Sequence, residues 1–268
     1  MRELGSILTD TIWQTILEEI KYYKNLQLEL EIDYQKFYLY SLITHSTAIE
    51  GSTLTELDTQ LLFDDGITAK GKPLIHHLMN NDLKNAYTFA IECAKEKKPV
   101  TIDLLREFNA KVLKTTGSIY NVAGGSFDSS KGEFRLCGVK SGYGGTSYMD
   151  YKKASAKLNE FCTELQNKMI CVESEQDRYK LSFDAHYNLV TIHPWADGNG
   201  RTARLVMNYI QFCYGLVPAK VYKEDKADYI SALVDSDKNE SLQPFRSFMA
   251  TQLLKMLQEE NGKNEIRA

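Results

Sequence analysis

The apolar residues of this chain recur every three or four positions along most of its length, which is the spacing of one face of an α-helix. Between Thr11 and Glu50 the pattern contains no proline and predicts two helices, with a break between Asn25 and Asp33. The same spacing predicts four further helices, over residues 81–96, 102–114, 151–166 and 245–258. Two more apolar helices are predicted on either side of residues 193–204. The pattern therefore predicts an all-α fold.

Turn and capping residues mark where several of these helices begin and end. Gly51 ends the second helix. Thr53, with Glu56 three positions later, has the capping-box spacing and predicts the start of another helix that continues through Phe63. The polar residues 259–268 are predicted to form a frayed tail.

One region does not follow the helical pattern. Residues 117–146 hold eight of the sixteen glycines, around the short run from Glu133 to Cys137. Glycine at that density costs more backbone entropy than a packed helix tolerates. We therefore expect a loop with a small β-hairpin here, and a disordered surface loop is the alternative.

Composition and charge narrow the class of protein. The formal net charge of -4 and the pI of about 5.8 leave no excess of basic residues for a nucleic-acid backbone, so we expect no nucleic-acid partner. The five cysteines are widely spaced and form no Cys-x-x-Cys pair, which argues against a disulfide framework or a zinc knuckle. No stretch is long and apolar enough for a membrane span or a leader. We expect a cytoplasmic protein without a membrane partner.

The densest polar stretch is HPWADGNGRTAR, residues 193–204, which lies between two apolar helices. The turn from Asp197 to Gly200 leads directly into the second helix, with Asn199 as the expected N-cap. A helix N-terminus carries a partial positive charge and free N–H groups, and it therefore attracts anions.

The charged side chains of this stretch fit a phosphate site. Arg201 and Arg204 share one helix face at the N-terminal end, where buried cations need an anion such as a polyphosphate. Asp197 fits a Mg²⁺ ion held by one carboxylate and substrate oxygens. His193 can take a proton from a hydroxyl that attacks phosphorus. The alternative is a hydrogen-bonded core histidine beside arginines that pair with structural carboxylates.

The stretch resembles the signature of the Fic family of nucleotide transferases, H-P-F-x-[D/E]-G-N-G-R-x-x-R. Trp195 replaces the usual phenylalanine and keeps a large aromatic side chain. The likeness extends over about residues 100–250. It implies a mostly helical Fic fold, which we divide into an N-terminal helical region (1–98), a catalytic core (99–258) and the tail (259–268).

This resemblance implies that the protein transfers AMP from ATP to a Ser, Thr or Tyr hydroxyl of a target protein and releases pyrophosphate. His193 would be the general base, and Asp197 would hold Mg²⁺ between the α- and β-phosphates. The remaining residues of the motif would bind the nucleotide: Gly198, Asn199 and Gly200 as an anion cradle, Arg201 on a phosphate and Arg204 on the γ-phosphate. One of the chain's own tyrosines or serines could also be modified.

Family members also carry a hairpin called the flap, with a G-x-[Y/F]-R opening. Gly132, Glu133, Phe134 and Arg135 resemble this opening and are expected to hold the target segment by strand addition. The sequence that follows, from Ser141 to Gly145, departs from the family pattern, so it does not define the length of the flap.

Glu50 lies in the last turn of its helix, where a carboxylate faces the negative end of the helix dipole and needs a cation. Ser46 to Gly51 resembles the inhibitory motif [S/T]-x-x-x-E-[G/N] of Fic proteins with an N-terminal inhibitory helix. The resemblance implies that Glu50 pairs with Arg204 in the place of the γ-phosphate. A coupling of about 1–3 kcal/mol would lower activity roughly 5- to 150-fold. An exposed glutamate is the alternative.

Three other functions stay open for the same residues. Glu50 could position water to remove AMP from a modified protein, or the donor could be a nucleotide other than ATP. A nucleotide-binding module without turnover is also possible, although His193 argues against it. Of the other histidines, His186 is expected to be structural. His45 is expected to lie at the surface, and a pH-sensitive cap of the inhibitory helix is the alternative.

Overall fold

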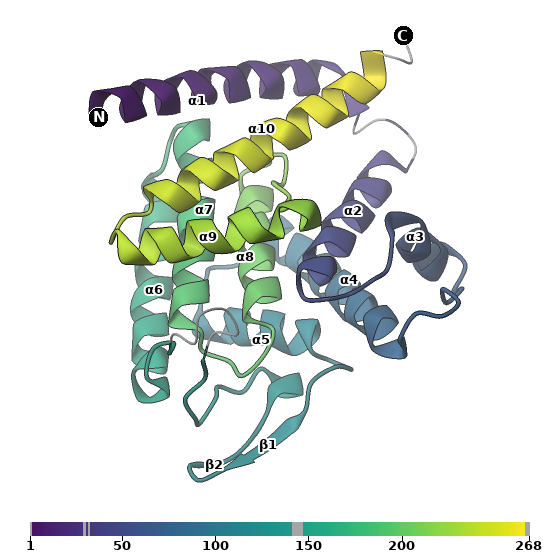
Figure 1. The fold of residues 1–268 in the computed structure, drawn as a ribbon, viewed down its shortest axis with the longest axis vertical. Coiled ribbons are helices and arrows are strands. Elements are labelled where there is room, and N and C mark those ends of the chain that lie inside the picture. The colour runs from purple at the N-terminus through teal and green to yellow at the C-terminus, as the bar shows by residue number, and fades with distance from the viewer. Residues whose placement is uncertain (1, 29–30, 32, 141–146, 266–268) are drawn as a thin grey trace.

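The computed structural model describes residues 2–28, 31, 33–140 and 147–265. Most of these residues are helical, which confirms the predicted all-α class (Figure 1). The helices, in chain order, are α1 (Arg2–Asn25), α2 (Tyr34–Ile49), α3 (Glu56–Asp64), α4 (Leu74–Lys95), α5 (Ile102–Val112), α6 (Tyr151–Cys171), α7 (Glu175–Ile192), α8 (Asn199–Cys213), α9 (Lys226–Lys238) and α10 (Gln243–Glu265). Short 3₁₀ turns cover Ser129–Lys131 and Lys223–Asp225.

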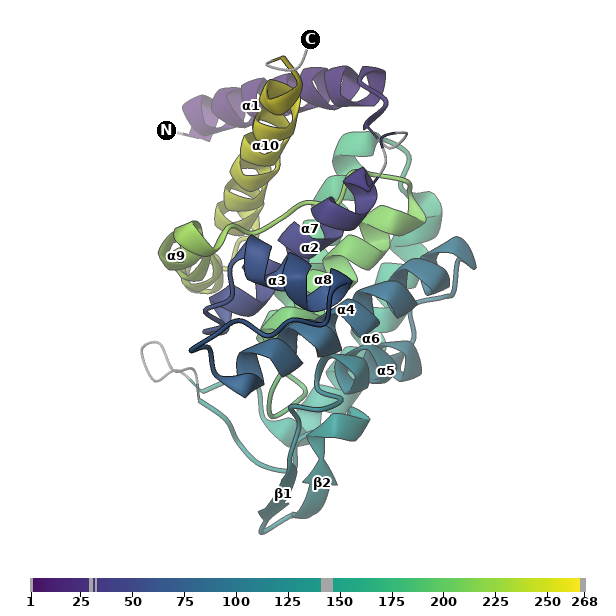
Figure 2. The same ribbon diagram turned by 90° about the vertical axis from the view of Figure 1, so that its right-hand side faces the viewer.

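Helix α8 is the central element of the core. It packs against α7, α4, α5 and α2, and every residue from Arg201 to Gln211 is buried. The sequence of this helix is apolar on almost every side, which is typical of a helix surrounded by others. In Figure 2, α2, α3 and α4 lie together on one flank of α8. The site at the start of α8 is therefore held by several helices at once.

The first and last helices pack on each other at one end of the molecule (Figure 1). Apolar residues of α1, including Trp13, Ile16 and Ile20, are buried, as the helical spacing predicts. Helix α10 continues to Glu265, beyond the predicted end at residue 258. Glu260 and Asn261 are buried, so at least this part of the predicted tail is packed helix rather than frayed.

Several helix starts differ from the prediction. The capping box of α3 is made by Thr55 and Asp58, two residues later than the predicted pair. The Thr55 hydroxyl accepts from the Asp58 N–H at 3.1 Å, and the Asp58 carboxylate accepts from the Thr55 N–H at 2.9 Å. Glu56 is not a capping residue because its side chain bonds to α2 instead. Helices α4 and α6 are longer than predicted, and α9 was not predicted.

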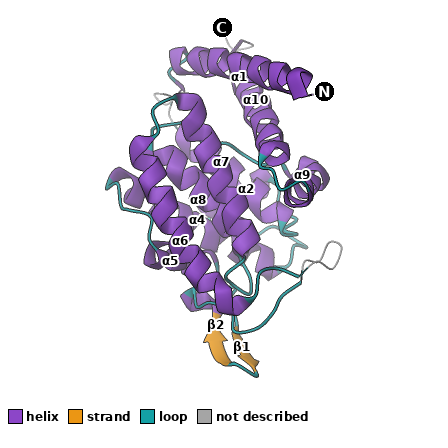
Figure 3. Cartoon of the chain, turned by 90° about the vertical axis from the view of Figure 1, so that its left-hand side faces the viewer, coloured by secondary structure: helices purple, strands orange, loops and turns teal. Residues whose placement is uncertain are grey.

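The predicted hairpin exists but lies earlier in the chain. Strand β1 (Ile119–Val122) pairs antiparallel with β2 (Gly125–Asp128). Figure 3 shows this hairpin at the end of the molecule opposite α1. Residues 133–137 contain no strand, because Gly132 turns the chain in the left-handed region and Arg135 is drawn into the core. An isolated antiparallel bridge joins Lys140 to Ser147, and residues 141–145, where the sequence left the family pattern, lie outside the described part.

In the described ranges, no helix has both the length and the apolar character that a membrane span requires.

Candidate active site

His193 caps the C-terminal end of α7 in an unusual backbone conformation. Its φ of 50° and ψ of 58° are left-handed, which is uncommon for a residue with a side chain and marks a constrained position. Its backbone carbonyl accepts from Arg135 Nε at 2.8 Å. Its ring Nδ1 lies 3.2 Å from the Val190 carbonyl oxygen. Because a carbonyl can only accept, this contact assigns the ring proton to Nδ1 and leaves the lone pair to Nε2.

The environment of His193 keeps its imidazole neutral. Burial lowers the pKa of His193 to about 4, although the hydrogen bond to the Val190 carbonyl acts in the opposite direction. At neutral pH the ring can therefore accept a proton at Nε2, as a general base must.

The turn between His193 and α8 is closed by Asn199. The Asn199 side chain accepts from the Trp195 N–H at 3.2 Å and donates to the Trp195 carbonyl at 2.9 Å. The predicted N-cap at Asn199 is therefore wrong, since Asn199 is the first residue of the helix and Gly198 precedes it with a φ of 76°. A Cβ at Gly198 would come within 2.8 Å of the Asn109 amide nitrogen.

Arg201 and Arg204 lie next to each other at the start of α8, and each is at least 96% buried. Arg201 contacts Asp197 through Nη2 at 3.3 Å, while its buried Nε and Nη1 have no partner among the described residues. Buried guanidinium donors without acceptors are costly and indicate that an anion belongs there. This feature agrees with the phosphate site expected from the sequence.

Arg204 is held by the end of α2. Its Nε donates to the Ser46 hydroxyl at 2.9 Å, and its Nη2 donates to the Ser46 carbonyl at 2.9 Å and to Glu50 Oε1 at 2.7 Å. Burial by itself would raise the pKa of the Glu50 carboxyl, but the charge and hydrogen bond of Arg204 outweigh it and lower the pKa. The expected contact between Glu50 and Arg204 is thus present.

The close approach of Glu50 depends on Gly200. A Cβ at this position would lie 2.5 Å from Glu50 Oε1, inside the contact distance of real side chains. Gly51, which follows Glu50, has a φ of 102°, and this conformation lets the chain leave α2 at once. Both glycines therefore allow the carboxylate to reach the start of α8.

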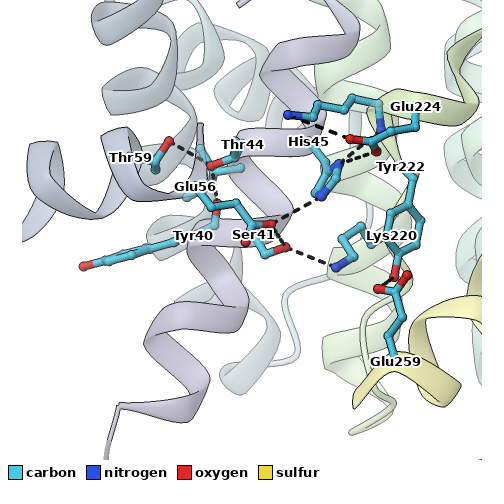
Figure 4. Close-up of polar contacts among 12 residues, drawn as sticks. Tyr40, Ser41, Thr44, His45, Glu56, Thr59, Lys220, Tyr222, Glu224 and Glu259 are labelled. Atoms are coloured by element: carbon cyan, nitrogen blue, oxygen red, sulfur yellow. Dashed lines mark hydrogen bonds and ion pairs between the residues drawn. The ribbon is translucent and has the colours of Figure 1, made fainter. Parts of the chain in front are cut away.

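The face of α2 that bears His45 is tied to two other segments (Figure 4). His45 is buried rather than at the surface, which corrects the expectation from the sequence. Its Nδ1 accepts from the Lys223 N–H at 3.1 Å, and its Nε2 lies 3.3 Å from Glu56 Oε1. Ser41 donates to the same carboxylate oxygen at 2.6 Å, and Lys220 Nζ lies 3.1 Å from Ser41 Oγ. These contacts fix α2 to α3 and to the segment before α9.

The four residues expected to open the flap are engaged inside the protein. The Gly132 carbonyl accepts from Trp195 Nε1 at 3.2 Å, and Phe134 packs against the Trp195 ring. The Glu133 carboxylate accepts from the Asp128 N–H at 2.7 Å. Arg135 is 1% exposed and donates to backbone carbonyls. Their contacts brace the turn at residues 193–195, and their role in target binding stays a prediction.

Asp197 is the residue expected to hold a metal. Its side chain is 53% exposed, and its Oδ1 accepts from the Gly198 N–H at 2.6 Å. The structure, over the residues it describes, contains no group of three or more His, Cys, Asp or Glu side chains that could hold a metal ion. One exposed carboxylate fits Mg²⁺, which keeps several waters and is held largely by substrate phosphates.

Two residues at the site were missed by the sequence analysis. Asn109 on α5 donates to the Asp197 carbonyl at 3.3 Å and to the Thr202 hydroxyl at 3.1 Å, and so ties α5 to the turn. Tyr148 stacks on the ring of His193. Neither residue lies near the motif in sequence, and no local pattern distinguishes them from ordinary packing residues.

Comparisons with known proteins agree with this geometry. Residues 99–211 match the Fic/DOC family. The chain is 29% identical over 211 residues to a protein adenylyltransferase Fic of Nematostella vectensis, an alignment that covers 78% of this chain and 45% of the relative. The chain therefore spans less than half the length of that relative.

Solved structures share the fold. A Fic domain containing signaling protein from Bacteroides thetaiotaomicron superposes with a TM-score of 0.77 at 23% identity, covering 91% of this chain and 94% of the other. Fic-1 from C. elegans (residues 134–508) gives a TM-score of 0.76 at 22% identity, covering 98% of this chain and 76% of the other. The sequence motif, the shared fold and the match over residues 99–211 all point to similarity with the Fic/DOC family.

Proposed function

We propose that this protein is a protein adenylyltransferase that transfers AMP from ATP to a hydroxyl of a target protein and is inhibited by its own helix α2. The observation that carries the proposal is the buried Arg201, whose partnerless N–H groups lie at the start of α8 a few residues after a neutral histidine. The name of the Nematostella relative, a protein adenylyltransferase, supports AMP as the transferred group.

The reaction starts at His193. Nε2 takes the proton of a Ser, Thr or Tyr hydroxyl as that oxygen forms a bond to the α-phosphorus of ATP. The bond between the α-phosphorus and the bridging oxygen to the β-phosphate breaks, and pyrophosphate leaves with its electron pair. The proton on His193 is then released to solvent. The Val190 contact, which keeps the other ring proton on Nδ1, preserves the tautomer that this step needs.

The start of α8 binds the triphosphate. The backbone N–H groups of Gly198, Asn199 and Gly200 and the positive end of the helix dipole form the cradle. Arg201 supplies the N–H donors that no described residue accepts, and Arg204 binds the γ-phosphate when Glu50 is displaced. Asp197 would hold a Mg²⁺ ion, which neutralises phosphate charge when bound.

Helix α2 acts as the inhibitor. Glu50 binds the guanidinium of Arg204, which the γ-phosphate would otherwise bind. ATP therefore cannot adopt the productive pose while this ion pair persists. The contacts of Ser46 on the same guanidinium hold the helix in register. The polar contacts of His45 and Ser41 hold the other face of α2 in place.

Other outcomes for the same site involve a different reaction or partner. Glu50 could position water for removal of AMP from a modified protein, and a different nucleotide could be the donor. The acceptor could be another protein or this chain itself. Residues 132–135 and the hairpin near them are our candidates for contact with that acceptor.

The test is label transfer from ATP labelled at the α-phosphate, with Mg²⁺, in the wild type and in Glu50→Gly. Glu50→Gly combined with His193→Ala tests the base. Glu96→Gly is the matched control, because Glu96 also caps the C-terminal end of a helix but lies on α4 away from the site. We expect strong labelling only in the Glu50→Gly single variant.

Two results would contradict the proposal. If Glu50→Gly binds ATP but labels neither itself nor any lysate protein, AMP transfer from ATP fails, and α-labelled forms of the other nucleotides become the next donors to test. If the wild type removes label from a modified protein and Glu50→Gly does not, the site removes AMP.

A further inference from the structure

The ring of Tyr148 lies flat on the imidazole of His193. The ring centroids are 3.6 Å apart and the planes differ by 12°, which is a close face-to-face stack. Tyr148 belongs to the segment between the hairpin and α6, outside the family motif and outside the residues expected to bind nucleotide. The contact joins this segment directly to the proposed general base.

The stack leaves the reactive direction of the imidazole open. The lone pair of Nε2 lies in the plane of the ring, so an aromatic ring on the face does not obstruct a hydroxyl that approaches in the plane. Rotation about the last side-chain bond of histidine is otherwise broadly tolerated. The contact of Nδ1 with the Val190 carbonyl restrains this rotation. The Tyr148 ring, which is stacked on one face of the imidazole, restrains it as well.

The backbone around Tyr148 is fixed relative to His193. The Tyr148 N–H donates to the Val139 carbonyl at 3.2 Å. The guanidinium of Arg135 donates to the carbonyl of Met149, next to Tyr148, at 2.5 Å and to the carbonyl of His193 at 2.8 Å. A planar guanidinium offers its donors in a rigid fork. One buried side chain therefore sets the spacing between the two stacked residues.

We propose that Tyr148 is the positioning residue of His193, and that its aromatic face orients the imidazole so that Nε2 meets the incoming hydroxyl and shields the ring from water. This proposal rests on the proposed function, in which His193 is the base. The role requires the ring face rather than the phenol, so phenylalanine should replace tyrosine and leucine should not.

The electrostatic surroundings agree with shielding by Tyr148. The charged groups that act on His193 are Arg135, Glu50 and Asp197, and their effects on its pKa are of mixed sign. Burial is the largest cause of the low pKa, and the Tyr148 ring covers one face of the imidazole. Removal of this ring should therefore raise the pKa of His193 toward the ordinary value of about 6.5.

The experiment compares Tyr148→Phe and Tyr148→Leu in the Glu50→Gly protein. Tyr187→Leu is the matched control, since Tyr187 is a half-buried tyrosine of α7 whose ring packs on Phe245 rather than on His193. The first readout is the NMR spectrum of histidine labelled in the ring, assigned with His193→Ala and followed through a pH titration. The second is kcat and KM for ATP in AMP transfer.

We expect His193 ring protons shifted upfield by the stacked ring in the parent, Tyr148→Phe and Tyr187→Leu. In Tyr148→Leu this shift should disappear, the titration midpoint should rise, and kcat should fall roughly 10- to 100-fold with KM for ATP within about twofold. The proposal is overturned if the parent shows no ring-current shift, or if Tyr148→Leu loses it and keeps kcat and the midpoint.

The two proposals fail in different ways. If the Glu50→Gly parent transfers no AMP, the proposed function fails, while the spectra and the titration still decide whether Tyr148 orients and shields His193. If the parent is active and its His193 signals are unshifted, only the role of Tyr148 fails.

Discussion

Arg201 and Arg204 are three residues apart on the same helix and almost equally buried, yet their surroundings differ. Arg204 is bound by Ser46 and Glu50 at the end of α2, whereas two donors of Arg201 have no acceptor among the described residues. Arg204 is paired through Nε and Nη2 and keeps one buried nitrogen, Nη1, without an acceptor among the described residues, whereas Arg201 is paired through Nη2 alone. Under the proposed function, α2 supplies a carboxylate in place of one anionic group of the nucleotide and leaves the free nitrogens of Arg201 for another.

The largest expected effect on stability comes from Arg204→Met. This change leaves the Glu50 carboxylate, one-third exposed, without its cation, and the loss of a charged hydrogen-bond network should lower the free energy of unfolding by about 2 kcal/mol. Urea denaturation measures this. Arg201→Met is the matched control and should change stability by less than about 1 kcal/mol, because two of its nitrogens have no described partner and the third contacts only the exposed carboxylate of Asp197. If both variants lost the same free energy of unfolding, the contacts of Arg204 would stabilise the protein no more than those of Arg201.

Arg201→Met should instead weaken nucleotide binding. Hydrogen bonds to charged groups are worth about 1.5–3 kcal/mol, so the Kd for ATP should rise roughly 10- to 150-fold. Isothermal titration calorimetry in the Glu50→Gly background gives the value without requiring turnover. An unchanged Kd would show that the unpaired donors of Arg201 do not bind the ligand.

Ser46→Ala should release the inhibition only in part. It removes one acceptor from Arg204 Nε and leaves Glu50 in place, so about 1 kcal/mol should be lost and AMP transfer should rise about fivefold. Ser52→Ala is the control, because the buried Ser52 contacts Asn80 and not Arg204. Activation as large as that of Glu50→Gly would mean that Ser46, rather than the carboxylate, carries the inhibition.

The smallest effect concerns the far face of α2 and depends on pH. The hydrogen bond between the Glu56 carboxylate and His45 lowers the pKa of Glu56 to about 2. The folded-state pKa therefore lies below the ordinary value of about 4.3. The stabilisation is then fully present above pH 4.3 and is lost as the pH falls toward 2.

Urea unfolding between pH 2 and 7 tests this. Glu56→Gln should be slightly less stable than the wild type at pH 7, and the difference should shrink as the pH falls below 4. Glu224→Gln is the control, since its carboxylate lies 3.7 Å from His45 Nδ1, beyond hydrogen-bond distance. A difference that grows on acidification would contradict the assignment.

Much of the fold and the site follows from local sequence. Helical spacing located most of the helices. The contiguous residues from His193 to Arg204 indicated a helix start with two arginines, on which the proposed phosphate site rests. Glu50 could also be recognised from local sequence, because a carboxylate at the C-terminal end of a helix, just before a glycine, faces the negative end of the helix dipole. Its contact with Arg204 follows once both ends are brought together.

The tertiary structure decided what depends on neighbours far away in the sequence. The capping box of α3 lies at Thr55 because Glu56 is engaged by α2, and the strands lie before residue 129 because Arg135 is drawn into the core. Tyr148 lies against His193 because the same buried guanidinium, that of Arg135, binds the backbone next to both residues. Spacing along a chain fixes which face a residue occupies, whereas the choice between competing partners depends on the geometry that packing brings about.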